Sequence, residues 1–455
     1  MSAYGSLYRG VLMPVWETWI RHRPTLQHLR ELERTQWCSL DELKSIQSSS
    51  LRRLLVHSYD HVPYYRARFD EVGLRPSDVS GPVDLGQLPL LTRQATRDAG
   101  ELRGSTAPPF PTIKKMTGGS TGQPLAFGYD AGSESWRNAV RLRGYGWAGC
   151  RPGDRTLHYW GRLPVHSHGY RWLKVTADRG LRREHVVDCG LRSDETLEET
   201  ARWIARARPT AIVSYCHAAV DLARYITEHR LKDWDSIPVL CCAEELLPSD
   251  RAVIAEAFGP AVFETYGCRE FMLIGMECAA HEGLHLSAEN LMVEVLVKDE
   301  GGKLRAAAPG EAGEVVVTDL HNFGMPFIRY ATGDVAIAAD ESRCGCGRAA
   351  PRLGAIGGRI TDTLVRLDGS RVEGILFNVI FTGLAKAVRQ FQVVQAKDRS
   401  ITLRLVPDET FTDMDREAIR ARCREYLGQL PVRIEEVQTI AERANGKRQV
   451  VVVEA

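Results

Sequence analysis

The sequence lacks an excess of charge of either sign. Its 59 lysine and arginine residues almost balance its 58 aspartate and glutamate residues. Such a balance leaves no global field that would attract nucleic acid or an anionic membrane. We therefore expect neither as a partner, and a small molecule is the expected ligand.

The sequence also lacks a long apolar run. Its N-terminal stretch is interrupted by Arg9, Glu17 and Arg21 before it reaches membrane-spanning length, and it has no signal-peptide pattern. Eleven cysteines are scattered without the dense, regular spacing of small secreted scaffolds. These features predict a cytoplasmic protein without a membrane segment.

Length and composition predict a globular chain of more than one domain. The chain has 455 residues, with 44% hydrophobic and 26% charged side chains. Residues 1–100 are expected to be mainly helical, and β-rich runs then alternate with helical stretches, which is typical of an α/β domain. We expect a large N-terminal domain of mixed β-sheets and helices over residues 1–359, a hinge over 360–364 and a small α+β domain over 365–455.

A segment rich in glycine and hydroxyl groups is the sharpest local motif. It runs from Thr117 to Gly122, where backbone amides and hydroxyl groups can converge on a phosphate. It departs from a Walker A loop, because Gln123 and Pro124 follow the glycine where that loop needs a lysine. An ordinary surface turn is the alternative for this segment taken alone.

Five further elements follow this loop in a fixed order. They are Cys242-Ala243-Glu244-Glu245, Glu264-Thr265-Tyr266-Gly267-Cys268-Arg269-Glu270, Phe327-Ile328-Arg329-Tyr330-Ala331-Thr332-Gly333-Asp334, Gly358-Arg359 and Gly446-Lys447-Arg448. With these elements the chain resembles the adenylate-forming superfamily of acyl-CoA synthetases and peptide-synthetase adenylation domains. Within that superfamily it resembles the phenylacetate–CoA ligase and capsular-biosynthesis adenylyltransferase-like branch.

The resemblance implies a role for each element. It implies that Glu270 binds Mg²⁺ and that the small domain is a mobile lid, which inserts Lys447 at the α-phosphate of ATP. The residues that it implies for nucleotide binding are Thr117, Gly118, Gly119, Ser120, Thr121 and Gly122 at the β- and γ-phosphates, Ala243 and Glu244 along the adenine, Thr265, Tyr266 and Gly267 in the motif whose tyrosine stacks on the base, Asp334 at the ribose hydroxyls, and Arg359 near the ribose and phosphate.

The implied reaction needs fixed positive charge. A carboxylate must attack the α-phosphorus of ATP although both groups are anions. Lys447 and the cation held by Glu270 would supply that charge. We therefore expect an ATP-dependent ligase that forms an acyl-adenylate, releases pyrophosphate and passes the acyl group to a thiol such as coenzyme A.

The acceptor is less firmly predicted than adenylation. Thr361 stands where phenylacetate–CoA ligases usually have an acidic hinge residue, and Cys268 stands where a serine or threonine is more usual. An alternative is an amide- or N–N-bond-forming ligase of secondary metabolism, with an amine, nitrite or a carrier protein as acceptor. A second alternative is a non-catalytic nucleotide-binding protein, against which the presence of Glu270 and Lys447 argues.

Two cysteine-containing pairs have the spacing of metal ligands. Cys278 and His281 form the first pair, and Cys344 and Cys346 form the second. Three thiolates and one imidazole suit a structural zinc ion, because four protein ligands leave no open position for water. His285 is an alternative ligand, and buried reduced cysteines without metal are the alternative to a zinc site.

An acyl pocket is expected from two further segments. The resemblance places both segments beside the α-phosphate, and an aromatic and imidazole wall would suit a planar or aromatic acid. The same residue types are also common in ordinary core packing. The candidates are Tyr145, Trp147, Ser214, Tyr215 and His217.

Overall fold

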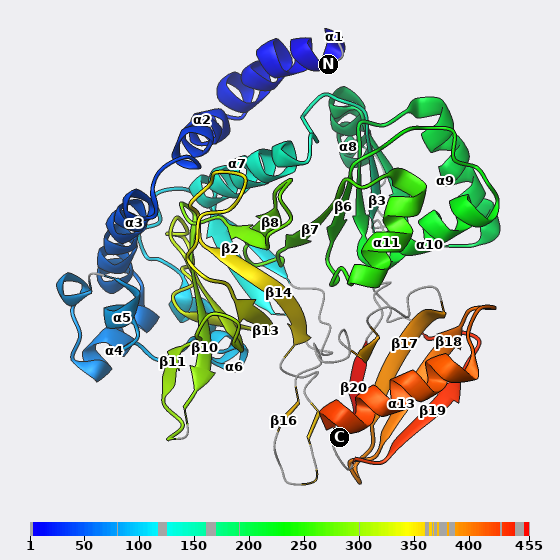
Figure 1. Ribbon diagram of the computed structural model, residues 1–455. Helices are drawn as coiled ribbons and strands as arrows, with labels where there is room; N and C mark the ends of the chain where they lie inside the picture. The colour runs from blue at the N-terminus through cyan, green and yellow to red at the C-terminus, as the bar shows by residue number, and fades with distance from the viewer. Residues whose placement is uncertain are drawn as a thin grey trace. The chain divides into compact units, whose positions relative to one another are not determined.

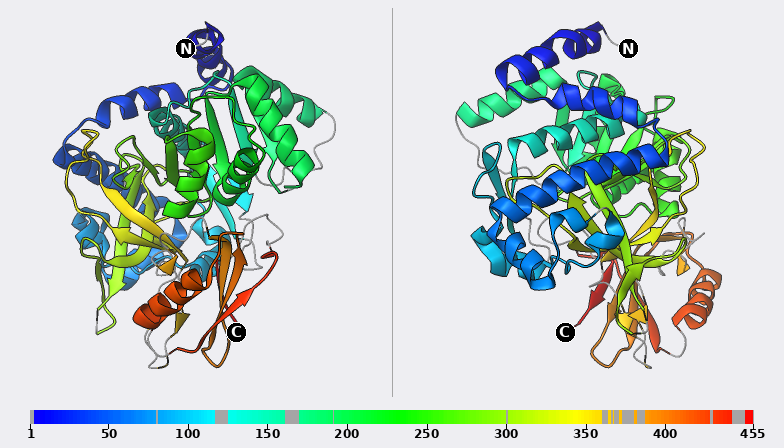
Figure 2. Two further views of the ribbon diagram at one scale, coloured as in Figure 1. Left: turned by 45° about the vertical axis from the view of Figure 1, so that its right-hand side comes forward. Right: turned by 90° about the vertical axis from the view of Figure 1, so that its left-hand side faces the viewer.

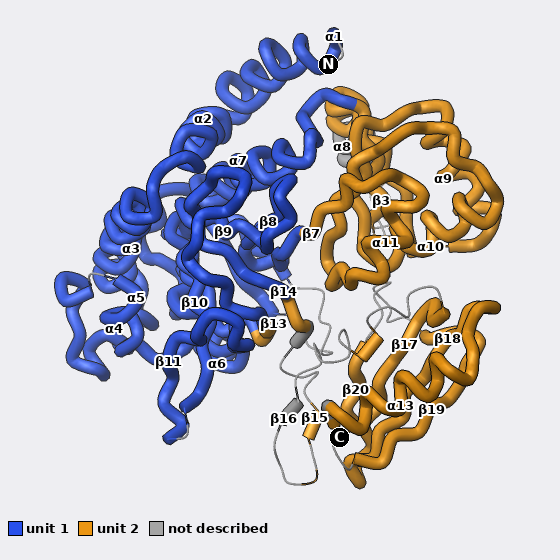
Figure 3. The backbone as a smooth tube through the Cα atoms, in the orientation of Figure 1, with its two compact units in different colours: residues 1–154, 265–332, 336–355 blue, residues 155–264, 333–335, 356–455 orange. Residues whose placement is uncertain are grey.

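The computed structural model shows two compact units, drawn as ribbons in Figure 1 and from two further sides in Figure 2. One unit has residues 1–154, 265–332 and 336–355, and the other has residues 155–264, 333–335 and 356–455 (Figure 3). The residues that the structure describes are 3–79, 81–116, 125–160, 170–190, 192–299, 301–359, 364–365, 367, 371–372, 380–381, 387–427, 430–441 and 450–454.

The first unit begins with a run of helices. Helix α3 (Leu40–His61) starts at Ser39, where Ser39 and Glu42 exchange hydrogen bonds between side chain and backbone, which satisfies amides at the helix start. Helix α4 (Pro63–Val72) ends at Gly73, which has a φ of 67°. The other helical segments before the first strand are α1 (Ala3–Leu7), η1 (Tyr8–Leu12), η2 (Val15–Ile20), α2 (Thr25–Thr35), η3 (Pro76–Asp78), α5 (Pro82–Leu85), α6 (Arg93–Ala99) and η4 (Gly100–Arg103).

The first unit continues with an antiparallel pair, a long helix and a sheet. Strands β1 (Thr112–Met116) and β2 (Ala126–Asp130) flank the glycine-rich segment, which lies outside the described residues. Asp130 caps helix α7 (Ala131–Trp147) by accepting from the Ser133 amide at 2.9 Å. The sheet has the order β11-β10-β12-β13-β14-β9-β8, formed by β8 (Gly275–Glu277), β9 (Leu284–Leu286), β10 (Leu291–Lys298), β11 (Leu304–Ala306), β12 (Ala312–Asp319), β13 (Tyr330–Ala338) and β14 (Arg352–Arg359).

The second unit contains parallel strands connected by helices. Neighbouring parallel strands need long crossovers, and here helices provide them. The chain leaves the last of these strands, β7, into the first unit. The strand order is β4-β3-β5-β6-β7, with β3 (Thr156–Trp160), β4 (Glu184–Asp188), β5 (Ala211–Tyr215), β6 (Val239–Cys242) and β7 (Val262–Tyr266), and the helices are α8 (Tyr170–Arg182), α9 (Asp194–Ala207), α10 (Cys216–Glu228) and α11 (Pro248–Phe258).

The C-terminal segment is an α+β arrangement with its own buried core. Its core includes Leu403 and Leu405 of one strand and Ile419 and Cys423 of the helix. The sheet order is β19-β18-β17-β20, from β17 (Val388–Gln395), β18 (Ile401–Pro407), α13 (Asp413–Leu427), β19 (Val432–Glu436) and β20 (Val451–Val453), preceded by the pair β15 (Leu364–Val365) and β16 (Arg371–Val372).

The predicted fold class is confirmed, because mixed sheets and helices are followed by a small α+β segment. The predicted domain limits, 1–359 and 365–455, remain a prediction. So does the hinge, whose residues 360–363 lie outside the described residues.

Candidate functional site

The segment after strand β7 is a tight turn. Tyr266 pairs with Gly275 of β8, and its carbonyl accepts from the Ile274 amide at 2.8 Å. A side chain at Gly267 would place a Cβ only 1.8 Å from the Met272 carbonyl oxygen, so the backbone can approach this closely only at a glycine. The Met272 amide donates to the Cys268 carbonyl at 2.7 Å and closes the turn.

The turn lies beside the start of the glycine-rich segment. Arg269 Nη1 donates to the carbonyl of Met116 at 2.9 Å, although the two residues are 153 positions apart. Met116 ends strand β1 and directly precedes Thr117. The structure therefore brings Met116, which precedes the predicted phosphate loop in the sequence, into contact with the turn that contains Glu270. Residues 117–124 themselves lie outside the described residues.

Glu270 lies within this turn and is almost buried, with 6% of its surface exposed. Its backbone carbonyl accepts a hydrogen bond from Arg137. Among the described residues, no hydrogen bond or ion pair engages its carboxylate. A nearly buried carboxylate that keeps its lone pairs has the oxygen chemistry that Mg²⁺ prefers, so the residue fits the predicted cation.

The predicted ribose residue lies in strand β13. Asp334 is half-buried and follows Gly333, which has a φ of 77°. The strand begins at Tyr330, whose ring packs edge-on against Phe271, next to Glu270 in the chain, with centroids 5.9 Å apart. Burial raises the pKa of the Tyr330 hydroxyl. The start of this strand is therefore anchored to the Glu270 turn.

Two other residues predicted to contact the nucleotide have side chains outside the described part of the structure. Arg359 is the last residue of strand β14, and its side chain is outside the described part. Lys447 lies in the segment 442–449, which is also outside the described residues. Their roles stay predictions.

In the second unit, predicted adenine and acyl-pocket residues follow two adjacent strand ends. Ala243, with a φ of 70°, and Glu244 follow β6, and His217 opens helix α10 after β5. The Glu244 carboxylate accepts from the His217 amide at 3.1 Å and lies 3.2 Å from His217 Nδ1. Ligands of parallel α/β sheets bind at such carboxyl ends. The structure therefore joins Glu244 and His217 in one place.

The other acyl candidates of this unit lie next to that pair. Tyr215 ends strand β5, and its ring meets Trp160 edge-on, with centroids 4.9 Å apart. Ser214 is fully buried, and its hydroxyl donates to the Tyr215 carbonyl at 2.8 Å. Trp160 was not among the predicted residues. The one signal that could have indicated it is its position at the end of the neighbouring strand β3.

The indole of Trp147 has polar and aromatic partners in other segments of the first unit. Its Nε1 donates to Gln36 Oε1 at 2.9 Å, and its ring lies 4.5 Å from the Arg348 guanidinium and 5.7 Å from the His285 ring. The indole thus packs beside His285 and Arg348, and the role of Trp147 in the acyl pocket stays a prediction. Tyr145, two residues earlier on α7, is half-buried, with the Arg141 guanidinium 5.7 Å from its ring.

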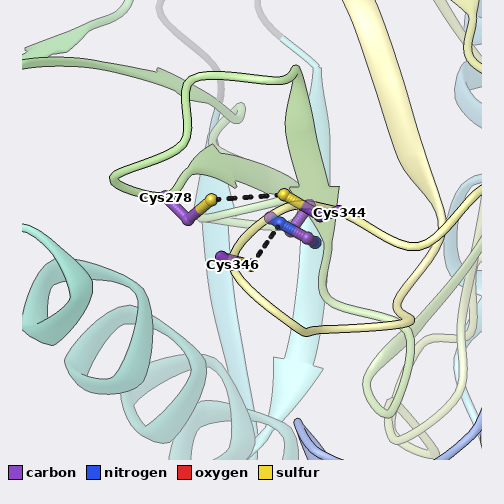
Figure 4. Close-up of side chains that lie close together, drawn as sticks. Cys278, Cys344 and Cys346 are labelled. Carbon is purple, nitrogen blue, oxygen red and sulfur yellow. Dashed lines mark hydrogen bonds between the residues drawn. The ribbon is translucent and has the colours of Figure 1, made fainter.

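The two cysteine-containing segments meet in the first unit. The group consists of Cys278, His285, Cys344 and Cys346, whose ligand atoms all lie within 4.8 Å of one another. Cys278 Sγ and Cys344 Sγ are 3.6 Å apart, and Cys346 Sγ is 3.4 Å from His285 Nε2. Figure 4 shows the three cysteine side chains close together, with a dashed line between Cys278 and Cys344. We refer to these four residues as the Cys/His cluster.

The prediction of His281 as the fourth member is wrong. His281 belongs to the turn after Cys278, has a φ of 53°, and places its Nδ1 at 3.2 Å from Glu277 Oε2. His285, weighed as the alternative, lies on β9 and is only 1% exposed. Burial, followed by nearby arginines, lowers the pKa of His285 to about 4.

The geometry of the cluster fits a zinc ion. Tetrahedral zinc, with bonds of about 2.3 Å to sulfur and about 2.0 Å to nitrogen, separates its ligand atoms by about 3.5–3.8 Å. The Cys278–Cys344 sulfur–sulfur distance of 3.6 Å and the Cys346–His285 sulfur–nitrogen distance of 3.4 Å are close to these values, and all four ligand atoms lie within 4.8 Å of one another. The loop from Cys344 turns at Gly347, where φ is 87°, and the Gly345 amide donates to Glu282 at 2.9 Å.

Comparisons with known proteins show similarity to phenylacetate–coenzyme A ligases. A family model described as the CapK C-terminal domain matches residues 364–454. A phenylacetate–coenzyme A ligase of Thermus thermophilus is 27% identical over 375 residues, which cover 79% of this chain and 80% of the relative. A phenylacetate–coenzyme A ligase of Escherichia coli is 28% identical over 346 residues, covering 74% and 75%.

A solved structure shares the fold. The crystal structure of a 2-hydroxyisobutyryl-CoA ligase with an acyl-AMP ligand matches with a TM-score of 0.74 at 20% identity, and the match covers 92% of this chain and 91% of that one. Within the described residues, no helix combines the length and the apolar character needed to cross a membrane.

Proposed function

Because the chain is a relative of the phenylacetate–coenzyme A ligases and has the fold of an acyl-CoA ligase, we propose that it is an ATP-dependent adenylate-forming ligase of carboxylic acids. In the first step a carboxylate oxygen attacks the α-phosphorus of ATP, which forms acyl-AMP and releases pyrophosphate. In the second step the thiol of coenzyme A attacks the acyl carbon and loses its proton, and AMP leaves.

The turn at Glu270 is the observation that carries this proposal. Gly267 lets the chain fold back, and Arg269 contacts Met116 at the start of the glycine-rich segment. In this proposal the carboxylate of Glu270 acts together with the amide and hydroxyl donors that follow Met116 in the sequence. An ordinary surface turn would need neither the close approach nor the contact over 153 positions.

We assign Glu270 to the binding of Mg²⁺ with ATP. When bound, the ion would offset the charge of the phosphates as pyrophosphate leaves. The carboxylate is nearly buried and makes no hydrogen bond or ion pair within the described part of the chain, which leaves its oxygens available. The remaining nucleotide contacts of the proposal are those of Thr117 to Gly122, Ala243, Glu244, Thr265, Tyr266, Asp334 and Arg359.

Lys447 is proposed to act in the first step only. It stands in the segment that matches the CapK C-terminal domain and is far in sequence from the glycine-rich segment. Closure of the C-terminal domain about residues 360–364 would bring its ammonium group to the α-phosphate, where negative charge increases in the transition state.

The acyl pocket is proposed at the ends of strands β3 and β5. Trp160 and Tyr215 supply aromatic surface, and Glu244 fixes the orientation of His217. An aromatic wall with one polar edge suits a planar acid. We therefore propose an aromatic carboxylic acid as the first substrate to test.

We also propose one structural zinc ion in the Cys/His cluster. Three thiolates and one imidazole from two loops and strand β9 match the ligand set and the distances of a closed tetrahedral site. None of the eleven cysteines of the chain is paired in a disulfide, so the thiols of Cys278, Cys344 and Cys346 can serve as ligands.

One assay tests the reaction and its acceptor together. Pyrophosphate release is measured over a panel of aromatic and aliphatic acids, with coenzyme A, hydroxylamine, amines, nitrite or a phosphopantetheine carrier protein as acceptor. We expect acid-dependent release and an acyl-CoA product with an aromatic acid. Release without thioester, together with an amide product, would identify an amine-using ligase, and ATP binding without release for any acid would identify a non-catalytic nucleotide-binding protein.

A further inference from the structure

Arg137 on helix α7 is buried against the Glu270 turn. It is 1% exposed, and its Nη1 donates to the backbone carbonyl of Glu270. Its Nη2 donates to Asp319 Oδ2 at 2.6 Å, its Nε donates to Ser133 Oγ at 3.0 Å, and its guanidinium lies 4.3 Å from the Tyr129 ring. Only a planar fork of several donors can serve all of these partners at once.

A buried ion pair of this kind is not explained by stability alone. Arg137 and Asp319 are 1% and 0% exposed at their side chains. Removing two charges from water costs more than their attraction returns unless further hydrogen bonds are made. Burial raises the pKa of Asp319, and the charge of Arg137 opposes that rise. The hydrogen bond from Arg137 to the Glu270 carbonyl is one of the further bonds that offset the cost of burying this pair.

Helix α7 carries a second buried ion pair, which makes no hydrogen bond to the Glu270 carbonyl. Arg143 Nη1 donates to Glu289 Oε1 at 2.6 Å, with side-chain exposures of 4% and 3%. Glu289 also accepts from Thr35 of helix α2 at 2.7 Å. This pair ties α7 to the helical start of the chain, and Glu289 and Thr35 both lie outside the Glu270 turn. It supplies a matched comparison for Arg137.

The backbone at Glu270 is fixed on both sides. Gly267 and the Cys268–Met272 hydrogen bond set the turn before it, and Phe271 after it is fully buried against Phe327, with ring centroids 5.3 Å apart. Arg137 holds the carbonyl between these two anchors. The clamp thus fixes the peptide from which the Glu270 side chain projects, and only the side-chain torsions of Glu270 remain to set the direction of its carboxylate.

We propose that Arg137 is a positioning residue for the metal-binding carboxylate: it clamps the Glu270 peptide, with Asp319 and Ser133 holding the guanidinium, and so aims the carboxylate at the cation of MgATP. This inference rests on the proposed role of Glu270. Residues that orient a metal ligand without touching the metal typically change metal affinity by about 10–100-fold when they are replaced.

The test measures ATP binding by isothermal titration calorimetry with and without Mg²⁺. The quantity of interest is the gain in ATP affinity that Mg²⁺ provides. Arg137→Lys keeps the charge but loses the fork, and we expect its gain to fall about 10-fold, while its affinity for metal-free ATP is unchanged. Arg143→Lys is the control and should keep the full gain. Ser133→Ala, which removes the partner of Nε, should show a smaller loss and guards against a poorly folded Arg137→Lys.

Hydrogen exchange of a peptide covering residues 265–272 gives a second readout. Exchange should rise in Arg137→Lys and stay unchanged in Arg143→Lys. An equal loss of the Mg²⁺ gain in both variants would mean a general loosening of α7 and would overturn the inference, as would an unchanged gain in both Arg137→Lys and Ser133→Ala.

Glu270→Gln separates this inference from the proposed function. If Glu270→Gln keeps the Mg²⁺ gain, the metal role of Glu270 is wrong and the inference falls with it. If Glu270→Gln loses the gain and the Arg137 and Ser133 variants keep it, only the positioning role of Arg137 is wrong.

Discussion

The Glu270 turn and the Cys/His cluster lie at opposite ends of the same short strand and are held in different ways. Strand β8 has three residues; its first residue, Gly275, pairs with Tyr266, and Cys278 follows its last residue. The turn is held by a close backbone approach at Gly267 and by the Arg137 clamp. The cluster brings together four possible ligand atoms from segments up to 68 positions apart, as Cys278 and Cys346 show, and the proposed zinc ion would join them.

The difference between the two regions predicts different consequences of mutation. A turn fixed by its backbone keeps its shape when one side-chain group is removed, so a change there should affect chemistry more than folding. A cluster that joins distant segments restricts the unfolded chain and satisfies buried thiols, so a change there should affect folding more than chemistry. The variants below test this separation.

Lys447→Ala should have the largest effect on chemistry. Losing one preorganised stabiliser of the transition state costs about 10²–10³ in rate, so adenylate formation should slow by that factor with ATP binding nearly intact. Pyrophosphate release and ATP binding are measured on the same preparation. The variant supplied with a synthetic acyl-adenylate should still transfer the acyl group. Equal loss in both half-reactions would make Lys447 a structural residue, and near-normal adenylation would remove it from the site.

Glu270→Ala should lower pyrophosphate release by about 10²-fold, because a cation that offsets phosphate charge contributes several kcal/mol to the transition state. The melting temperature should change by less than about 3 °C, since the turn is held by its backbone. Thermal unfolding and initial rates at saturating Mg²⁺ check both statements. Unchanged turnover at saturating Mg²⁺ would take Glu270 out of the mechanism.

Cys344→Ser should lower stability more than it lowers the rate of pyrophosphate release. We expect about one zinc ion per wild-type chain and less than about 0.2 in the variant, with a loss of more than about 2 kcal/mol in the free energy of unfolding. Metal analysis and chemical denaturation measure these quantities. Wild-type protein from zinc-replete medium that also holds less than about 0.2 zinc ions would contradict the zinc proposal.

The smallest effect is expected for His281→Ala. Its ring is one-third exposed and faces Glu277, so zinc content should be retained and stability should change by less than about 0.5 kcal/mol. His285→Ala is the matched comparison and should lose the metal. The reverse result would restore the histidine that the spacing favoured.

Local motifs were predictable because their spacing reflects local geometry. The cysteine pairs and the Tyr266 to Glu270 segment each occupy a few consecutive residues, and the structure brings Cys278 together with Cys344 and Cys346. The histidine was mistaken because the C-x-x-H spacing favoured His281, whereas the turn after Cys278 directs that ring to Glu277. His285 points to the cysteines from a strand, where alternation of side chains decides the direction.

Long-range polar contacts could not be predicted from spacing. Arg137 and Asp319 are 182 positions apart, and each alone is an ordinary charged residue of a helix or a strand end. Trp147 was predicted in the acyl pocket from the resemblance of its segment, and the partners that the structure gives it, Gln36 and Arg348, come from two distant segments. Which distant segment covers an aromatic ring depends on the packing of the whole unit, which one segment does not contain.

Arg348 lies between the Cys/His cluster and two tryptophans, so tryptophan fluorescence should report on the state of the cluster. Its guanidinium lies 4.6 Å from the Trp37 ring and 4.5 Å from the Trp147 ring, and Arg348 is two residues after Cys346. Indole emission depends on the charges and hydrogen bonds next to the ring, and both rings here contact a loop that the cluster would order. The intrinsic fluorescence of these two tryptophans can therefore follow metal loading and loss in the unlabelled protein, in real time and without a substrate.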